Sequence, residues 1–196
     1  MKKMTMKKTT PLRKSLLVAL SVTSLSVASV TVSQAATSSA PLNEVAAATQ
    51  SKISLEQALA IATKSVKGDV ISAEYDQDDN TANGNYELKI ITNNMEQEVT
   101  VNANTGKVTK DETERLDKDD LAEYGTIRDA KVSLSQAIKN ANQTVKGTVL
   151  EAEYDMDFGK PVYKIEIGKG NQIHKVVVDS ATGNITRNQA SDVDDD

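Results

Sequence analysis

The sequence predicts an α+β fold built from two tandem copies of one unit, each a helix packed on a small antiparallel β-meander. The first observation is an internal repeat: "KISLEQALAIATKSVKGDVISAEYD" (52–76) and "KVSLSQAIKNANQTVKGTVLEAEYD" (131–155) align without a gap, with 14 of 25 positions identical. The second is that the hydrophobic period changes within each copy from 3.6 residues to 2, as a helix followed by strands requires. The third is that the match resumes downstream, between "EVTVNANTGKV" (98–108) and "KVVVDSATGNI" (175–185).

Each copy begins with a predicted helix. Ser54 and Ser133 are N-cap candidates, and each is followed three residues later by Gln, which is the spacing of a capping box. Gly68 and Gly147 lie where a left-handed residue ends a helix. In both copies one apolar face follows the helical period. Its members are Leu55, Leu59, Ala62 and Val66 in the first copy and Leu134, Ile138, Ala141 and Val145 in the second.

Strands follow each helix. Apolar and polar residues alternate over three stretches, which predicts an antiparallel meander with one buried and one solvated face. The turns "NANTG" and "DSATG" lead to a short fourth strand at 107–109 or 184–186, because the side chain of Asn102 or Asp179 can bond the turn amides. The predicted inward residues are Ile71, Ala73, Tyr75, Tyr86, Leu88, Ile90, Val99 and Val101, and their counterparts Leu150, Ala152, Tyr154, Tyr163, Ile165, Ile167, Val176 and Val178.

The repeat defines the predicted domains. We expect units at 53–109 and 132–187, joined by a charged linker at 110–131. The linker contains a few apolar residues that allow a connecting helix as far as Gly125. A unit of this size buries only about 60% of its chain surface and is marginally stable alone, so we expect the two units to dock on each other.

The N-terminus predicts export. Residues 1–14 carry six Lys or Arg and no acid, and residues 15–32 are mostly apolar. Ser33 and Ala35 then occupy the small-residue positions of a cleavage site. A transmembrane anchor is the alternative, since the run is about long enough to span a bilayer, but its seven hydroxyl residues favour a cleaved signal peptide over 1–35. We therefore expect an exported protein that is extracellular, cell-wall-associated or periplasmic.

Composition limits the partners of the mature chain. Removal of residues 1–35 takes away six of 23 Lys and Arg, which leaves 17 against 28 Asp and Glu, a formal charge of −11. Such a surface repels phosphate backbones and anionic lipids, so we expect neither nucleic acid nor membrane as a partner. The chain has no Cys, so burial of a core must replace disulfides. Residues 36–52 predict a flexible lead-in, and residues 188–196 predict a solvated acidic tail.

The stretch "DQDDNTANGNYE" (76–87) resembles a calcium-binding EF-hand loop in its alternating Asp and Asn residues and in its closing Glu87. Its flanks alternate like strands, however, and the sixth position of the loop, which needs Gly, is Thr81. We interpret it as the polar tip of a hairpin, with weak calcium binding as the alternative.

No set of residues predicts catalysis. His174 is the only His, and its place on a strand favours a structural role, while a zinc site would need several His or Cys. "TGK" (105–107) lacks the frame of a phosphate-binding loop. We therefore predict no catalytic, cofactor-binding or metal-binding residues, no cofactor and no enzyme activity. Four tyrosines are expected to complete the seam between helix and sheet rather than to stack on a ligand: Tyr75, Tyr86, Tyr154 and Tyr163.

The order of these motifs resembles the PepSY domain, present here in tandem. The series is a capped "SLxQA" helix, a Gly, a strand ending in "AEY", then "Y-x-[LI]-x-I" and "V-x-V-[ND]-x-x-TG-x-[VI]". The resemblance implies a cystatin-like fold in each unit, a helix packed on an antiparallel sheet. It also implies a non-catalytic module of the kind found in propeptides of secreted metallopeptidases and in other bacterial envelope proteins, where it binds or restrains a peptidase.

The sequence therefore predicts an exported, non-catalytic binding module whose partner is a protein, with a secreted or envelope peptidase as the implied class. We expect contact through an edge strand or through the outer face of the sheet. The alternative is an acidic, calcium-binding protein of the cell envelope that uses residues 76–87, the linker and the tail.

Overall fold

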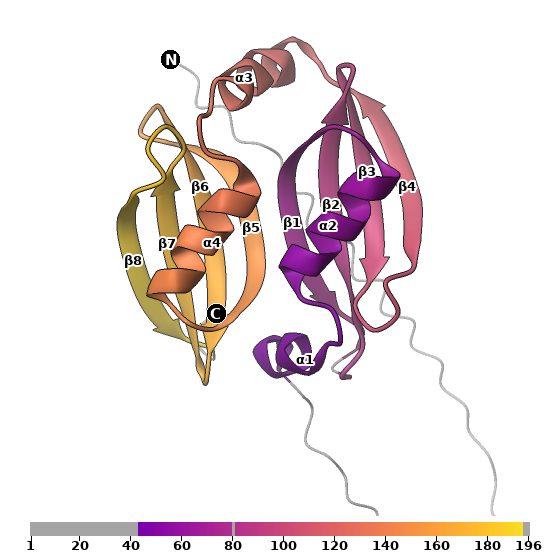
Figure 1. Ribbon diagram of the computed structural model, residues 1–196, viewed down its shortest axis with the longest axis vertical. Coiled ribbons are helices and arrows are strands. Elements are labelled where there is room, and N and C mark those ends of the chain that lie inside the picture. The colour runs from indigo at the N-terminus through magenta and orange to yellow at the C-terminus, as the bar shows by residue number, and fades with distance from the viewer. Residues whose placement is uncertain (1–42, 80, 194–196) are drawn as a thin grey trace, which may run out of the picture. The chain divides into compact units, whose positions relative to one another are not determined.

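The structure is a computed structural model that describes residues 43–79 and 81–193. The predicted signal peptide (1–35) lies outside these residues. The described chain is a mixed α/β fold with four helices and one eight-stranded antiparallel sheet (Figure 1). The helices are α1 (Glu44–Gln50), α2 (Leu55–Ser65), α3 (Lys118–Arg128) and α4 (Leu134–Thr144). The strands are β1 (Asp69–Gln77), β2 (Gly84–Thr92), β3 (Met95–Asn102), β4 (Val108–Arg115), β5 (Thr148–Asp157), β6 (Lys160–Lys169), β7 (Gln172–Asp179) and β8 (Ile185–Asp192).

One sheet replaces the two separate meanders that the repeat predicts. The strand order is β4-β3-β2-β1-β5-β6-β7-β8, so each copy contributes four consecutive strands and the first strands of the two copies pair with each other. The pairing is antiparallel, with Ala73 opposite Ala152. The expectation of two independent helix-on-meander units is therefore right only in part. A lone meander would leave its first strand as an unpaired edge, and the β1–β5 pairing satisfies both such edges at once.

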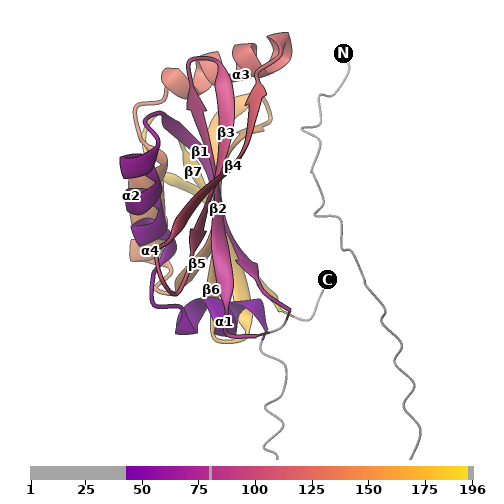
Figure 2. The same cartoon turned by 90° about the vertical axis from the view of Figure 1, so that its right-hand side faces the viewer.

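Helices α2 and α4 lie on the same side of the sheet, as Figure 2 shows, and they contact each other. Their predicted apolar faces are buried, and together with the inward residues of both meanders they form a single hydrophobic cluster. The predicted position of Ile71 is wrong. A β-bulge between Val70 and Ser72 turns Ile71 away from this cluster, into a small second one with Ile91 and Leu116.

The helix ends differ from the prediction in two details. The capping box of α2 is complete, but that of α4 is half formed, because the Gln136 side chain donates to Asn140 Oδ1 (2.9 Å) instead of capping. Gly68 and Gly147 are not left-handed, since the positive-φ residues do not include them. They are glycines because a Cβ there would lie 2.3 Å from the Ile91 carbonyl oxygen or 2.4 Å from that of Gly168.

The four tyrosines occupy the seam between helices and sheet, as predicted. They form two T-shaped pairs, Tyr75–Tyr86 with ring centroids 5.4 Å apart and Tyr154–Tyr163 at 5.7 Å. The Tyr86 hydroxyl donates to the carbonyl of Ile53 (2.6 Å), just before α2. The Tyr163 hydroxyl makes the equivalent 2.6 Å bond to Val132, just before α4. Each pair therefore fixes the entry of one helix onto the sheet.

Ordered structure extends into all three segments that were expected to lie outside the units. The lead-in (36–52) contains α1, which buries Val45, Ala47 and Ala48. The charged segment 110–131 contains the end of β4 and the helix α3, and the tail (188–196) contains the end of β8. Strands β4 and β8 are exposed along seven of their eight residues. Their backbone bonds to β3 and β7 extend them where the side chains have no apolar pattern.

The helix that precedes each copy bridges the two copies. Val45 of α1 fills the space above Gly168 of β6, and Thr49 Oγ1 lies 2.8 Å from Thr148 Oγ1 at the start of β5. In the same way, the Tyr124 hydroxyl of α3 donates to Asp69 Oδ2 (2.6 Å) at the start of β1. The first residues of β1 and β5 are equivalent in the repeat, so α1 and α3 make equivalent contacts with the copy that they do not precede. Each helix also contacts its own copy, since α1 packs on β1 and Thr126 Oγ1 of α3 lies 2.7 Å from the Tyr154 hydroxyl of β5. They lie at opposite ends of the sheet in Figure 2.

The packing of Val45 on Gly168 predicts that Gly168→Ala destabilises the protein. The added Cβ would lie 2.6 Å from Val45 Cγ1, which is closer than side-chain carbons approach, so the free energy of unfolding should fall by about 1–3 kcal/mol. Val45→Ala introduced into that variant should restore part of the loss. Gly125→Ala in α3 is the control, since its Cβ would meet nothing within 4 Å, and it should gain up to about 1 kcal/mol. Denaturant unfolding measures both, and a Gly168→Ala variant as stable as the parent would contradict the packing.

Candidate interaction surface

The face of the sheet opposite α2 and α4, called here the open face, carries a row of glutamates across the junction between the copies. Glu74 of β1 is opposite Glu87 of β2 on one side and opposite Glu151 of β5 on the other. Glu151 is in turn opposite Glu166 of β6. We call these four residues the glutamate row. Like charges directly opposite each other destabilise a sheet, so the row is not explained by the stability of the fold.

Burial, and after it the charges of neighbouring carboxylates, raise the pKa of acidic side chains in and beside the row. Partial burial raises the pKa of Glu87 to about 7, and the negative charges of Glu98, Asp76 and Glu74 add to this effect. Burial is also the main cause that raises the pKa of Glu74, followed by the charge of Asp76. Glu44, the first residue of α1, belongs to the same field, because burial and then the charges of Glu166, Asp76 and Glu74 raise its pKa.

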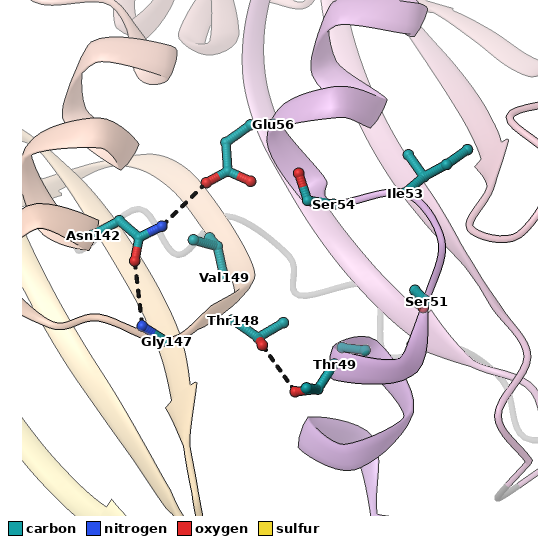
Figure 3. Close-up of a pocket in the computed structure, with 10 residues that line it drawn as sticks. Thr49, Ser51, Ile53, Ser54, Glu56, Asn142, Gly147, Thr148 and Val149 are labelled. Carbon is teal, nitrogen blue, oxygen red and sulfur yellow. Dashed lines mark hydrogen bonds between the residues drawn. The ribbon is translucent and has the colours of Figure 1, made fainter.

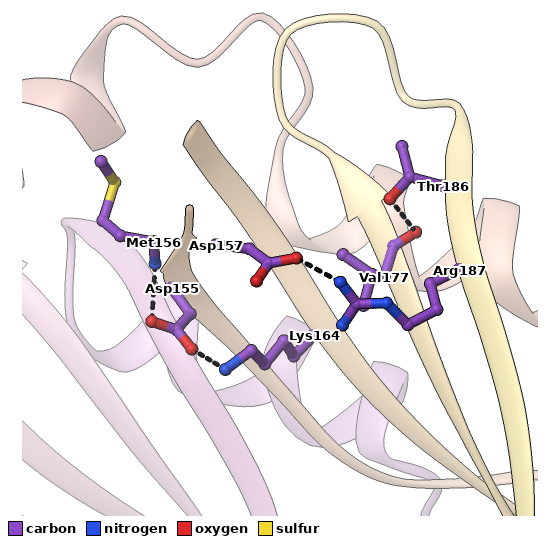
Figure 4. A network of polar contacts seen from close by, with 7 residues as sticks. All are labelled: Asp155, Met156, Asp157, Lys164, Val177, Thr186 and Arg187. Carbon is purple, nitrogen blue, oxygen red and sulfur yellow. Dashed lines mark hydrogen bonds and ion pairs between the residues drawn. The ribbon is translucent and has the colours of Figure 1, made fainter. Parts of the chain in front are cut away.

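The two halves of the open face differ in how their charges are matched. In the second copy, Lys175 Nζ lies 3.1 Å from Glu166 Oε1, and Figure 4 shows two further ion pairs of β5 carboxylates with Lys164 and Arg187. In the first copy, Lys89 Nζ lies 3.6 Å from Glu96 Oε1. Burial and, after it, the charges of neighbouring carboxylates raise the pKa of Glu74, Asp76, Glu87 and Glu98 on β1, β2 and β3. The first copy is the more negative half, since residues 52–112 hold 11 Asp and Glu against 6 Lys and Arg, whereas residues 131–188 hold 6 against 8.

A polar pocket of about 490 Å³ lies between α1, the start of α2 and the α4–β5 connection (Figure 3). Glu56 and the Asn142 amide approach to 3.4 Å across it. Its remaining polar side chains are the hydroxyls of Thr49, Ser51, Ser54 and Thr148. This lining offers hydrogen bonds to a small polar group, but it does not pair a nucleophile with a base.

The structure separates the residues that the sequence singled out. His174 is half-buried on β7, with Nδ1 3.4 Å from Asn188 Oδ1. "TGK" (105–107) lies in the β3–β4 turn, where Asn102 Oδ1 accepts from the Thr105 amide (3.0 Å) and Gly106 has a φ of +70°. The turn interpretation is thus confirmed.

Residues 76–87 form the β1–β2 hairpin. Glu87 lies within β2 on the open face, and the Asp78 amide donates to the Asn83 carbonyl (3.0 Å) across the tip. Asn80 lies outside the described residues. Within residues 43–79 and 81–193, no three His, Cys, Asp or Glu side chains are grouped so as to hold a metal ion. Calcium binding stays a prediction.

The glutamate row is the feature that sequence reasoning missed. Glu74 belongs to the repeated "AEYD" motif, whereas Glu87 closes the stretch that resembles a calcium loop. The sequence therefore assigns the two residues to different features. Their period-2 positions place them on one face of their strands. Their neighbours Glu151 and Glu166 could be added only after the β1–β5 pairing was known.

The two ends of the sheet differ as interaction edges. Strand β4, "VTKDETER", has charged side chains at five of eight positions, which is how natural sheets protect an edge. Strand β8, "ITRNQASD", has two. If a partner adds a strand to this sheet, β8 is therefore the edge that offers less electrostatic resistance.

The described residues thus combine a duplicated α/β fold with an open face that carries a row of glutamates. The family described as "Peptidase propeptide and YPEB domain" (PepSY) matches residues 52–112 and 131–188, and together these regions cover more than half of the chain. The protein belongs to the PepSY family. Domains of this family are generally non-catalytic regulatory modules that mediate protein interactions.

No curated protein matches the chain. A crystal structure of a "putative lipoprotein" from Clostridium difficile 630 is similar over 76% of this chain and 100% of its own, with 26% sequence identity and a TM-score of 0.47. Among residues 43–79 and 81–193, no helix combines the length and the apolar character needed to cross a membrane.

The glutamate row makes stability depend on pH. The pKa of Glu87 is raised from 4.5 to about 7 in the folded state, so the folded protein holds this proton more tightly than the unfolded chain does. The resulting stability is present below about pH 4.5 and is lost as the pH rises through about 7. The protein should therefore be more stable at pH 5 than at pH 8.

Glu87→Gln should stabilise the protein at pH 8, by on the order of 1 kcal/mol once solvent screening of this half-exposed group is allowed for, and should flatten the pH profile. Glu114→Gln, at an exposed position of β4, is the control and should leave the profile unchanged. Denaturant unfolding at several pH values measures both effects. Equal stability of the parent at pH 5 and pH 8 would contradict the raised pKa of Glu87.

Proposed function

We propose that this protein is an exported, non-catalytic module that binds a secreted or envelope peptidase and restrains it. The description of its family names peptidase propeptides, and this supports a peptidase as the partner. The basic and then apolar N-terminus supports export. The formal charge of −11 after signal cleavage argues against nucleic acid and anionic membranes as partners.

The observation that carries the proposal is the glutamate row on the open face. Placing Glu74 between two other glutamates costs stability, because neighbouring strands bring their carboxylates within the range of strong repulsion. A partner that presents Lys or Arg side chains to this face would relieve the repulsion and gain charge-assisted hydrogen bonds. The glutamate row is therefore electrostatically more favourable in a complex with a basic partner than in the free protein.

Electrostatics also indicates how the complex would form. The negative field of the first copy would orient a partner with a basic surface during diffusional encounter and raise the association rate. The continuous sheet provides a rigid platform that does not need to reorder on binding. Helices α1 and α3 are held against the strands at the two ends of this platform, so they limit the area that is available to the partner.

The proposal predicts that the purified protein forms a complex with at least one secreted metallopeptidase from the same cell and slows its turnover of a protein substrate. Glu74→Gln combined with Glu151→Gln should lower the association rate severalfold at low salt and reduce its salt dependence. Glu112→Gln combined with Glu114→Gln, on the β4 edge, is the matched control with the same change of net charge.

Surface plasmon resonance at several salt concentrations and an activity assay over a panel of such peptidases are the measurements. Failure to find any complex, together with undiminished proteolysis across the panel, would remove the proposal. A complex whose association rate responds equally to both double variants would retain the function but exclude the open face.

A further inference from the structure

The tip of the β5–β6 hairpin exposes a large aromatic side chain. Phe158 is 94% exposed, and it is the only Phe of the chain, which also lacks Trp. Met156, two residues earlier in β5, is 37% exposed. The exposed large hydrophobic side chains of the described residues are Leu121, Met156 and Phe158, so two of the three belong to this hairpin.

The backbone at the tip disfavours Phe. Asp157 is paired with Lys160, so Phe158 and Gly159 form a two-residue loop, and their φ values are +50° and +76°. Two positive φ values define a type I′ turn, for which Asn-Gly is the preferred sequence. A bulky residue in the left-handed region is strained. The fold would be better served by Asn at this position, and solubility would be better served by any polar residue.

The equivalent hairpin of the first copy lacks this feature. It is longer and polar, "DQDDNTANG", and among its described residues Asp79 is left-handed (φ +42°), a residue type that tolerates this conformation. The two copies share the fold, so the aromatic tip is a property of the second copy alone.

The base of the β5–β6 hairpin is rigid and locally neutral. Asp155 is paired with Lys164, and Asp157 Oδ2 lies 2.6 Å from Arg187 Nη2 of β8, as Figure 4 shows. Two carboxylates of a strongly acidic chain are thus neutralised directly below Phe158. A contact made by this tip is therefore apolar rather than charged, in contrast to the glutamate row.

We propose that Phe158 is an anchor that enters an apolar side-chain pocket of the partner and, resting on the function proposed above, that this pocket is the substrate side-chain pocket of the restrained peptidase. An aromatic side chain on a rigid hairpin loses little conformational freedom on binding, and such residues dominate the energetics of interfaces. Backbone strain kept at an exposed tip is typical of a recognition element. The glutamate row would then set the association rate, and Phe158 the lifetime of the complex.

The proposal is tested first by separating stability from binding. Phe158→Asn creates the preferred turn sequence, so the melting temperature should rise by roughly 2–4 °C, while affinity for the peptidase should fall at least about thirtyfold, mainly through faster dissociation. Phe158→Ala should show the same loss of affinity. Asp79→Ala, at the left-handed tip residue of the first copy, is the matched control and should bind as the parent does.

The result that would overturn the proposal is a Phe158→Asn variant that binds the peptidase as tightly as the parent. If the parent itself binds no peptidase in the panel, the proposed function fails instead, so the two failures are distinguishable. A competitive pattern of inhibition against a small peptide substrate, lost in Phe158→Ala, would support placement in the substrate pocket. Inhibition that stays non-competitive would overturn that placement.

Phe158→Trp provides a direct probe, because it makes the only Trp of the chain. Its fluorescence should shift to shorter wavelength when the peptidase is added, and an active-site inhibitor of the peptidase should reverse the shift. Two outcomes would overturn the proposal. One is a blue shift with phosphatidylcholine vesicles, which would identify a membrane contact, and the other is a shift that grows with concentration of the variant alone, which would identify self-association.

Discussion

The pairing of β1 with β5 is the interaction on which the rest of the structure depends. It converts two marginal four-stranded meanders into one sheet and removes the edge that each would expose. Because the pairing is antiparallel, the two copies run in opposite directions across the seam, and the helix that precedes one copy reaches the first strand of the other. The contacts of α1 with Thr148 and of α3 with Asp69 are the consequence. Without the β1–β5 pairing, each helix would lose the part of its docking site that the other copy supplies.

The same pairing assembles the surface that we assign to binding. It brings Glu74 beside Glu151 and so extends two short acidic pairs into a row over four strands. The row and the strained Phe158 tip are the two places where the molecule departs from what its own stability favours. Natural sequences are locally consistent with their folds, so such departures are where function is to be sought. The two features also differ chemically, because the glutamate row is charged and the Phe158 tip is apolar. The row would therefore act in the encounter with a partner, and Phe158 in its retention.

Local chemistry made much of the fold predictable, and the failures have identifiable causes. The helix faces and the tyrosine seams followed from periodicity, and the duplication allowed each to be checked against its copy. Ile71 was placed wrongly because a bulge inserts one residue into the alternation, which periodicity cannot register. Gly68 and Gly147 were assigned to a left-handed turn, whereas the close approach of a neighbouring strand requires them. The ends of β4 and β8 were missed since backbone bonding to a neighbour, rather than side-chain pattern, extends them.

The sequence by itself determined that this protein is a duplicated helix-and-strand domain of an interaction family, because repeats, caps and hydrophobic periods are properties of the chain alone. Only the tertiary structure decided that the copies share one sheet, that the helix preceding each copy bridges the two copies and that four glutamates from distant segments lie in one row. An alternating pattern determines which face of a strand is buried, but it carries no information on which strand will pair with its edge. The exposure of Phe158 was decided in the same way, since an aromatic residue in a sequence is expected in a core until the fold places it at a tip.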